Sequence, residues 1–214
     1  MYLPSAFEQP DREVLHALMQ AHPFATLFSQ GAEGPTADHI PLELDASVGT
    51  HGVLRGHVAR ANPLWQLAAG QPVLAVFHGP QAYITPSWYA TKALTHKVVP
   101  TWNYAVVHAH GSLQVVEEAP WLHALVSRLT QEREAARSQP WAVGDAPPDF
   151  IQSLLRAIVG IEIPLTQLIG KFKLSQNRSA ADRAGVVAGL ATESPEGGAT
   201  AALMQSTLPK EPPR

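Results

Sequence analysis

The chain has 214 residues, a formal net charge of -3 and no cysteine. The lack of cysteine excludes disulfides, zinc fingers, iron–sulfur clusters and cysteine nucleophiles, and the small negative charge gives no overall basic field for nucleic acids. Charged residues make up only 15% of the chain, which favours a surface partly covered by a second copy.

The N-terminal residues show no basic segment followed by an apolar stretch, so they do not resemble a signal peptide. The chain also lacks an apolar run of roughly 18 residues, the length that a membrane span needs. We therefore expect a cytoplasmic protein that does not cross a membrane.

The first half of the chain reads as strands with short turns. A helix capped by Asp11 precedes them, and a short helix begins at Asn62-Pro63 and ends at Gly70. Period-two or continuous apolar patterns predict the strands 24–29, 38–44, 52–58, 73–78 and 81–84. Pro41 indicates an edge or a bulge in the second of these, and Gly79-Pro80 predicts a turn between the last two.

The second half is richer in helices. Residues 102–116 read as a strand or strand pair, 120–137 as a helix with one apolar face, and 161–168 as a final strand. A short helix follows Pro147-Pro148, and Ser179 is expected to cap a last helix ending at Leu190. We predict one mainly β domain over residues 1–190 with a helical C-terminal part, and a disordered tail at 191–214.

Aromatic and polar side chains are concentrated between Tyr83 and Gly111. This stretch holds two of the five tryptophans, three of the four tyrosines, two lysines and three histidines. Trp and Tyr offer flat apolar surface with a polar edge, while Lys97 offers a point charge suited to phosphate. The combination suits a flat, partly polar, anionic ligand such as a flavin nucleotide.

Six motifs in order resemble the PaiB-type family of FMN-binding negative transcriptional regulators. They are MYLPSAF, ADHIPL, GHVARANPLW, FHGPQAYITPSWY, KVVPTWNY and KLSQNR, and together they span about residues 1–190. The resemblance implies an FMN-binding split β-barrel with peripheral helices. It further implies a homodimer with FMN in the subunit interface. The fold alone does not settle the function.

Seven residues are candidates for holding FMN. Lys97 and Arg60 are the expected phosphate ligands, Arg60 by its resemblance to a basic residue after the third strand of split barrels. Thr101 and Asn103 would add donors, and His57 would reach phosphate or ribityl oxygens. Trp102 and Tyr104, two apart on one strand face, would shape the ring pocket. Each also has a structural interpretation, as a surface charge, a core histidine or a core or interface aromatic.

Two further clusters leave alternatives open. The segment 171–178 carries Lys171, Lys173 and Arg178, which would close over a partner's flavin site or contact DNA. His108 and His110 share a strand face and would begin a metal or haem site.

We expect an FMN-binding homodimer that acts as a regulator or a flavin-linked oxidoreductase. The alternatives are a DNA-binding repressor without redox activity and a haem- or metal-binding split barrel. FMN would carry any redox chemistry, and the sequence indicates no catalytic acid and no resident metal.

Overall fold

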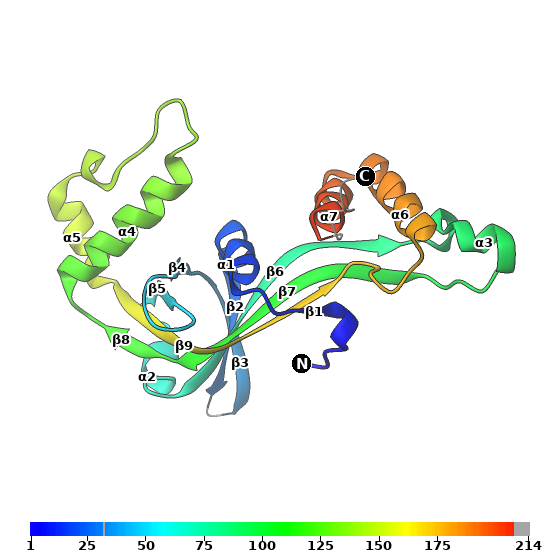
Figure 1. The fold of residues 1–214 in the computed structure, drawn as a ribbon. Coiled ribbons are helices and arrows are strands. Elements are labelled where there is room, and N and C mark those ends of the chain that lie inside the picture. The colour runs from blue at the N-terminus through cyan, green and yellow to red at the C-terminus, as the bar shows by residue number, and fades with distance from the viewer. Residues whose placement is uncertain (32, 208–214) are drawn as a thin grey trace. The chain divides into compact units, whose positions relative to one another are not determined.

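The computed structural model describes residues 1–31 and 33–207 (Figure 1). It divides into two compact units, each built from segments distant in sequence. The terminal unit contains Met1–Leu15, His78–Val107 and the described residues from Ile169 onward, and the central unit contains the described parts of His16–Phe77 and His108–Leu168. The single domain expected over 1–190 stays a prediction.

Nineteen elements follow one another along the described chain. They are η1 (Ser5–Phe7), β1 (Glu8–Gln9), α1 (Arg12–Ala21), β2 (Phe24–Gly31), β3 (Gly34–Pro41), β4 (Glu43–Asp45), β5 (Val53–Ala59), α2 (Leu64–Leu67), β6 (Pro72–Ile84), η2 (Pro86–Trp88), α3 (Ala90–Thr95), β7 (Thr101–Ser112), β8 (Gln114–Val116), α4 (Ala119–Glu134), η3 (Val143–Asp145), α5 (Pro148–Arg156), β9 (Ile158–Lys173), α6 (Ala180–Glu193) and α7 (Pro195–Ser206).

The strands form a sheet in the order β3-β2-β6-β7-β9-β5-β4, and β1 and β8 also pair with β9. Neighbours pair antiparallel, as in β2 with β3 and β5 with β9. β6, β7 and β9 each contribute residues to both units. β3 ends at Pro41 on the edge of the sheet, where a missing N–H is tolerated, as the sequence predicted.

The expected caps are present. Asp11 accepts from the backbone N–H of Glu13 at 2.9 Å, and the Asn62 side chain accepts from the N–H of Leu64 at 2.8 Å. Ser179 Oγ accepts from the N–H of Asp182 at 3.2 Å and so begins α6. These short polar side chains satisfy donors that the first helical turn leaves unpaired.

The turn predicted at Gly79-Pro80 is wrong, because β6 runs unbroken through both residues. β2 pairs with β6 at Leu74 to Val76, and this register places Phe24, the first residue of β2, opposite His78. Pro80 therefore lies beyond β2, where its missing N–H costs the sheet no bond on that side.

The tail predicted to be disordered is helical as far as Ser206, while residues 208–214 lie outside the described residues. In α7, Thr200, Ala201 and Met204 are buried, and the helix packs on α6. Small residues allow this close helix packing, and the buried contacts outweigh the low helix propensity of the glycines. The sequence of α7 has no strong apolar periodicity, so sequence analysis did not predict this helix.

Each unit has its own apolar core. In the central unit Leu27, Leu54 and Ile161 are fully buried, and in the terminal unit Ile84 and Phe172 are. Each such side chain contributes about 1.5–3 kcal/mol relative to an exposed position. Among the described helices, none is long and apolar enough to cross a bilayer.

Arg55 links three adjacent strands in the central unit. Its Nη1 lies 2.7 Å from Asp45 Oδ2 on β4, and its Nε lies 2.8 Å from Glu162 Oε1 on β9. Hydrogen bonds from Ser47 and then from Arg55 lower the pKa of Asp45 from 3.8 to about 2. The ionised carboxylate is therefore favoured in the folded state.

We expect Asp45 to make acid unfolding steeper. Its pKa is lower in the folded state, so its contribution is fully present above the ordinary value of 3.8 and is lost as the pH falls through about 2. Urea unfolding of Asp45→Asn between pH 5 and 2 should show a smaller fall in unfolding free energy than wild type. Glu118→Gln, at an exposed carboxylate that forms no ion pair with another described residue, should match wild type. Equal slopes for wild type and Asp45→Asn would contradict this role.

Candidate functional site

A small cavity of about 220 Å³ lies within the terminal unit, between the start of β7 and the end of β9. We call it the Lys173 pocket. It is lined by Phe7, Val99, Pro100, Thr101, Asn103, Lys173, Ser175, Asn177 and Arg178. Two cations and several uncharged donors line it, and none of these residues is acidic. The pocket is therefore suited to a small anionic group.

A fixed turn follows β9 and positions the pocket's polar side chains. Ser175 adopts the left-handed conformation with φ 63°, and its carbonyl accepts from the N–H of Arg178 at 3.0 Å. Gln176 accepts from the N–H of Leu174 at 2.7 Å and donates to the Phe172 carbonyl. These local bonds hold the turn and direct the segment into α6.

Lys173 carries a positive charge and has no carboxylate within 4 Å among the described residues. Its Nζ donates to the Thr101 hydroxyl and, at 2.7 Å, to the Trp102 carbonyl, which are both uncharged. Burial lowers the pKa of Lys173, and the charges of Lys171 and Arg178 lower it further. Bound phosphate would relieve this repulsion.

A buried amide supports the pocket from behind. Asn103 is 1% exposed, and its Nδ2 lies 3.0 Å from Ser175 Oγ and 3.4 Å from Met204 Sδ of α7. Ser175 Oγ in turn donates to Asn103 Oδ1 at 3.2 Å. The pair fixes β7 to the turn after β9, and truncating Asn103 would leave Ser175 without its partner.

Arg178 lies beside the ring of the buried Tyr89, with its guanidinium carbon 4.9 Å from the ring centroid. Among the described residues it has no ion pair within 4 Å, although the Asp182 carboxylate is close enough for Arg178 to lower its pKa. Thr91 N–H and Oγ1 both donate to Asp182 at 2.8 Å, which is the larger cause of that lowered pKa. Arg178 is thus held in place with donors left for a ligand.

Lys171 does not fit the expected DNA contact. It is 8% exposed, its Nζ donates to the Tyr2 carbonyl at 3.0 Å, and the rings of Tyr2 and Tyr104 lie 5.5 and 5.6 Å away. A lysine enclosed in this way cannot reach a DNA phosphate without rearrangement. Its charge instead acts on Lys173.

Of the predicted residues, the structure brings Thr101 and Asn103 into the Lys173 pocket. Trp102 points away from the buried side of β7, is 54% exposed and packs edge-on against Tyr83 at 6.0 Å. Tyr104 contacts Lys171 rather than the pocket. Lys97 is exposed in the loop before β7, where its N–H donates to Thr95 Oγ1.

The other two predicted residues belong to the central unit. Arg60 donates to Glu117 at 2.6 Å and to the carbonyls of Arg156 and Ile158, so its guanidinium is already occupied. His57 lines a separate, mainly apolar cavity of about 310 Å³ beside α4 and α5. Burial lowers the pKa of His57, and its Nδ1 has no hydrogen-bond partner among the described residues.

The H-x-H pair lies on β7 with ring centroids 6.5 Å apart. Across residues 1–31 and 33–207, no group of three or more His, Asp or Glu side chains is arranged to hold a metal ion. The third ligand that the metal alternative needs is thus not assembled around His108 and His110.

Sequence reasoning assigned the whole segment 171–178, which includes Lys173, Ser175, Asn177 and Arg178, to a partner's flavin site or to DNA. The order KLSQNR was the available signal. It did not reveal that a left-handed Ser175 turns these side chains toward Thr101 and Asn103, more than 70 residues earlier in the chain.

Residues 1–167 match the model of the family described as "Putative FMN-binding domain". The chain belongs to this family. The PaiB-type resemblance is confirmed by the protease synthase and sporulation protein PAI 2 of Bacillus subtilis, which is 33% identical over 99% of this chain and 100% of that protein. An uncharacterised protein of Emericella nidulans is 35% identical over 88% of this chain and 90% of its own length.

Solved structures share the fold of this FMN-binding family member. The FAD and heme binding protein from Mycobacterium smegmatis has a TM-score of 0.56 at 14% identity, covering 83% of this chain and 78% of that one. The flavocytochrome Anf3 from Azotobacter vinelandii has a TM-score of 0.55 at 12% identity, covering 78% and 69%. These likenesses confirm the split-barrel fold with its helical C-terminal part.

Family membership confirms FMN as the cofactor expected from the sequence. The residues of the Lys173 pocket fit its phosphate, since two cations, two hydroxyls and two amides line a cavity without a carboxylate. At about 220 Å³ the cavity is smaller than the roughly 300–1,000 Å³ of whole-ligand sites, so it suits a headgroup rather than the full nucleotide.

Proposed function

We propose that this chain binds FMN with the phosphate in the Lys173 pocket and serves as a flavin-linked regulator. The observation that carries the proposal is the pairing of Lys173 and Arg178 in one cavity without a carboxylate lining it. A dianionic phosphate would supply the missing negative charge. The shared polar chemistry of Thr101, Asn103 and Ser175 supports the same ligand.

Each lining residue has a distinct role in this proposal. Lys173 provides a point charge, and the Arg178 fork donates to two phosphate oxygens at once. The amides and hydroxyls complete the phosphate's hydrogen bonds. When bound, FMN supplies hydride or one-electron chemistry, while these residues bind and orient it.

The remaining predicted ligands stay proposals of unequal strength. Trp102 and Tyr83 offer exposed aromatic surface for the flavin ring, and Lys97 is free to approach from its exposed loop. Phosphate at Arg60 would have to displace Glu117 from the guanidinium. His57 would meet a ligand through a mainly apolar cavity.

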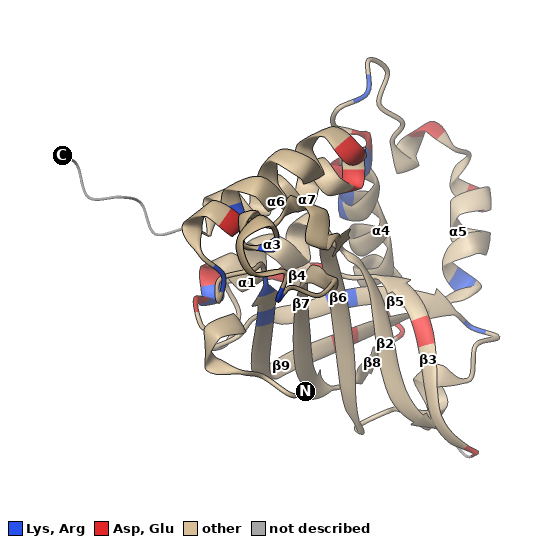
Figure 2. Cartoon of the chain, turned by 90° about the vertical axis from the view of Figure 1, so that its right-hand side faces the viewer, with Lys and Arg blue, Asp and Glu red and all other residues tan. Residues whose placement is uncertain are grey.

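A homodimer is part of the proposal. β2, β6 and β7, neighbours in the sheet, contain no Lys, Arg, Asp or Glu (Figure 2). Phe24 is 64% exposed on β2, and Tyr83 and Trp102 are exposed on β6 and β7. An uncharged sheet with exposed aromatic rings favours burial against a second copy. Sedimentation equilibrium should give twice the 23.0 kDa chain mass, and a stable monomer would remove this part of the proposal.

The regulatory role rests on the PaiB-type resemblance and on a relative named for protease synthesis and sporulation. Burial of Lys171 weakens direct DNA contact through the 171–178 segment. A flavin-linked oxidoreductase in the cytoplasm is the second candidate, and turnover of bound FMN by a reductant would favour it over a purely regulatory role.

The decisive test compares FMN with riboflavin, which has the same ring without the phosphate. Titration followed by flavin fluorescence should show one FMN per chain and an affinity at least about tenfold higher than that for riboflavin, as expected for lost charge-assisted bonds. Equal affinities would place the phosphate outside any cationic pocket. Failure of both ligands to bind would overturn the flavin proposal itself.

FMN affinity should fall at alkaline pH. The free protein lowers the pKa of Lys173 below its ordinary 10.5, whereas bound phosphate would raise it, so the complex binds more protons than the free protein. Above pH about 6 the phosphate is already dianionic. A decline in FMN affinity between pH 7 and 9.5 therefore reports deprotonation of Lys173. Riboflavin should show no such decline, and a pH-independent ratio of the two affinities would contradict the role of Lys173.

A further inference from the structure

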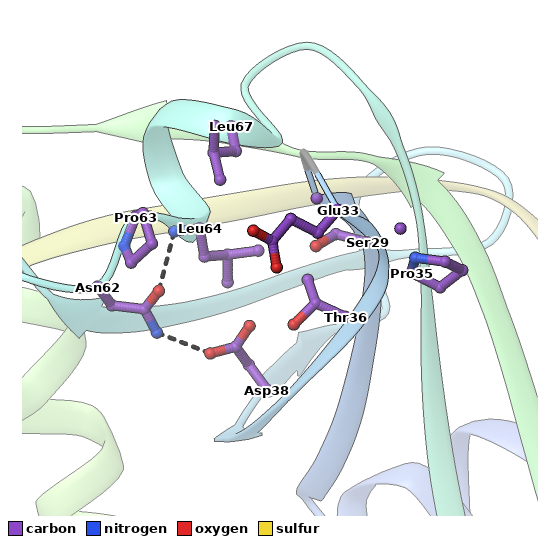
Figure 3. A pocket seen from close by; sticks show the side chains of 11 residues that line it. Ser29, Glu33, Pro35, Thr36, Asp38, Asn62, Pro63, Leu64 and Leu67 are labelled. Carbon is purple, nitrogen blue, oxygen red and sulfur yellow. Dashed lines mark hydrogen bonds between the residues drawn. The ribbon is translucent and has the colours of Figure 1, made fainter.

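A second, larger cavity of about 800 Å³ lies within the central unit, between the β2–β3 hairpin and α2 (Figure 3). We call it the Glu33 pocket. Its lining residues are Ser29, Gly31, Glu33, Gly34, Pro35, Thr36, Asp38, Asn62, Pro63, Leu64 and Leu67. Two carboxylates are among them, and no lysine, arginine or histidine is. Its charge is thus opposite to that of the Lys173 pocket.

The carboxylates of Glu33 and Asp38 are not neutralised by the described residues. With the rest of the described chain, neither forms an ion pair within 4 Å, and Glu33 forms no side-chain hydrogen bond. Asp38 Oδ1 accepts from Asn62 Nδ2 at 2.7 Å, which leaves its second oxygen for a ligand. Figure 3 shows both carboxylates turned toward the same space.

Ser29 provides an independent sign of a ligand. Its residue is only 8% exposed, and its hydroxyl has no hydrogen bond with another described residue. In Figure 3 the hydroxyl points into the pocket, facing the same space as Glu33 and Thr36. Ser29 Oγ is not one of the fully buried side-chain atoms without a partner among the described residues, so it is accessible from the pocket. The partner of Ser29 would therefore have to enter the pocket.

One wall of the pocket is apolar. Pro63, Leu64 and Leu67 come from α2 and its start, and Pro35 of the hairpin also lines the pocket. The volume is far above what one ion needs, and no described group of three acidic or histidine side chains forms a metal site. A ligand that satisfies both walls needs a positive group and an aliphatic part.

We propose that the Glu33 pocket binds an aliphatic primary ammonium compound. The ammonium donates to Glu33, to the free Asp38 oxygen and to the Ser29 hydroxyl, which matches its three N–H donors to three acceptors. The alkyl chain lies along Leu64 and Leu67. The site is separate from the phosphate site proposed above and needs no flavin.

Pentylamine is the probe, with 1-pentanol as its neutral match and pentanoate as its anionic match. In an NMR titration of the full chain, pentylamine should shift the backbone amide resonances of Gly31, Gly34 and Thr36. The titration is run once without FMN and once with FMN. Pentanol should bind at least about fivefold more weakly, since it lacks the charge. Pentanoate should not bind.

Variants localise the effect. Glu33→Gln should lower the affinity for pentylamine about fivefold. The double variant Glu33→Gln with Asp38→Asn should lower it at least about tenfold. Ser29→Ala should weaken it about threefold. Glu33 is exposed, so its replacement should leave thermal unfolding unchanged. Glu13→Gln, at an exposed carboxylate outside the pocket, should bind like wild type.

Three outcomes would overturn the proposal. One is equal affinity for pentanol and pentylamine. Another is unchanged binding by the Glu33→Gln and Asp38→Asn double variant. The third is loss of pentylamine binding when FMN is present, which would assign the Glu33 pocket to the flavin. None of these depends on whether Lys173 holds phosphate.

Discussion

Replacement of Lys173 by methionine is expected to lower FMN affinity about 10- to 100-fold, because it removes a hydrogen bond between charged groups in a partly buried site. Methionine keeps the length and apolar stem of lysine without its charge. Affinity for riboflavin should change little, since the loss falls on the phosphate. Flavin fluorescence titration of both ligands against both proteins measures the difference.

Lys92→Met is the matched control. Lys92 is an exposed lysine of the same unit, and its Nζ donates only to Ser87 among the described residues, at 3.1 Å. This variant should bind FMN as wild type does. The melting temperature of Lys173→Met should stay close to that of wild type, because loss of the bonds to Thr101 and Trp102 is offset by removal of a partly buried charge beside Lys171 and Arg178. An unchanged FMN affinity for Lys173→Met would remove the pocket from the proposed function.

Gly185→Ala is expected to lower the free energy of unfolding by about 3 kcal/mol and the melting temperature by roughly 10 °C. A Cβ at this position of α6 would lie 2.1 Å from the backbone oxygen of Trp88, which cannot move aside as a flexible side chain would. One turn later, a Cβ at Gly189 would lie 2.3 Å from the Trp88 ring. Both glycines therefore let α6 pack directly on η2.

Gly198→Ala tests the same added methyl group in open space. Gly198 lies in α7, and a Cβ there meets no atom within 4 Å. Because alanine is the better helix former, the free energy of unfolding of this variant should rise by about 0.5–1 kcal/mol. Calorimetry of the two variants separates steric exclusion from helix propensity. If both shift the melting temperature in the same direction, the close packing of α6 on Trp88 is not what the glycines serve.

Local signals in the sequence predicted much of the fold. The caps at Asp11, Asn62 and Ser179 act at short range, so their residue types sufficed. The path through Gly79-Pro80 and the helix at 195–206 were mispredicted for the opposite reason. Whether a proline ends a strand depends on which neighbour needs its N–H, and α7 is stabilised by contacts with α6 rather than by its own pattern.

The sequence predicted only part of the candidate site. Thr101 and Asn103 were recognised because hydroxyl and amide donors stand beside aromatic residues, and both line the Lys173 pocket. Arg60 has the same chemical type as a phosphate ligand, but Glu117 and two carbonyls occupy it. No local pattern distinguishes a paired arginine from one without a carboxylate, because the partner comes from a strand or loop far along the chain.

The Lys173 pocket also bears on how such chains are classified. The family match ends at residue 167, and Lys173, Ser175, Asn177 and Arg178 all follow it. Asn103 further depends on Met204 of α7, close to the end of the described chain. Two homologues can therefore satisfy the family definition equally well and yet differ in whether they retain these cations. If Lys173 and Arg178 hold the flavin phosphate as proposed, a census of such sites in this family would have to be scored on the C-terminal segment rather than on the domain that gives the family its name.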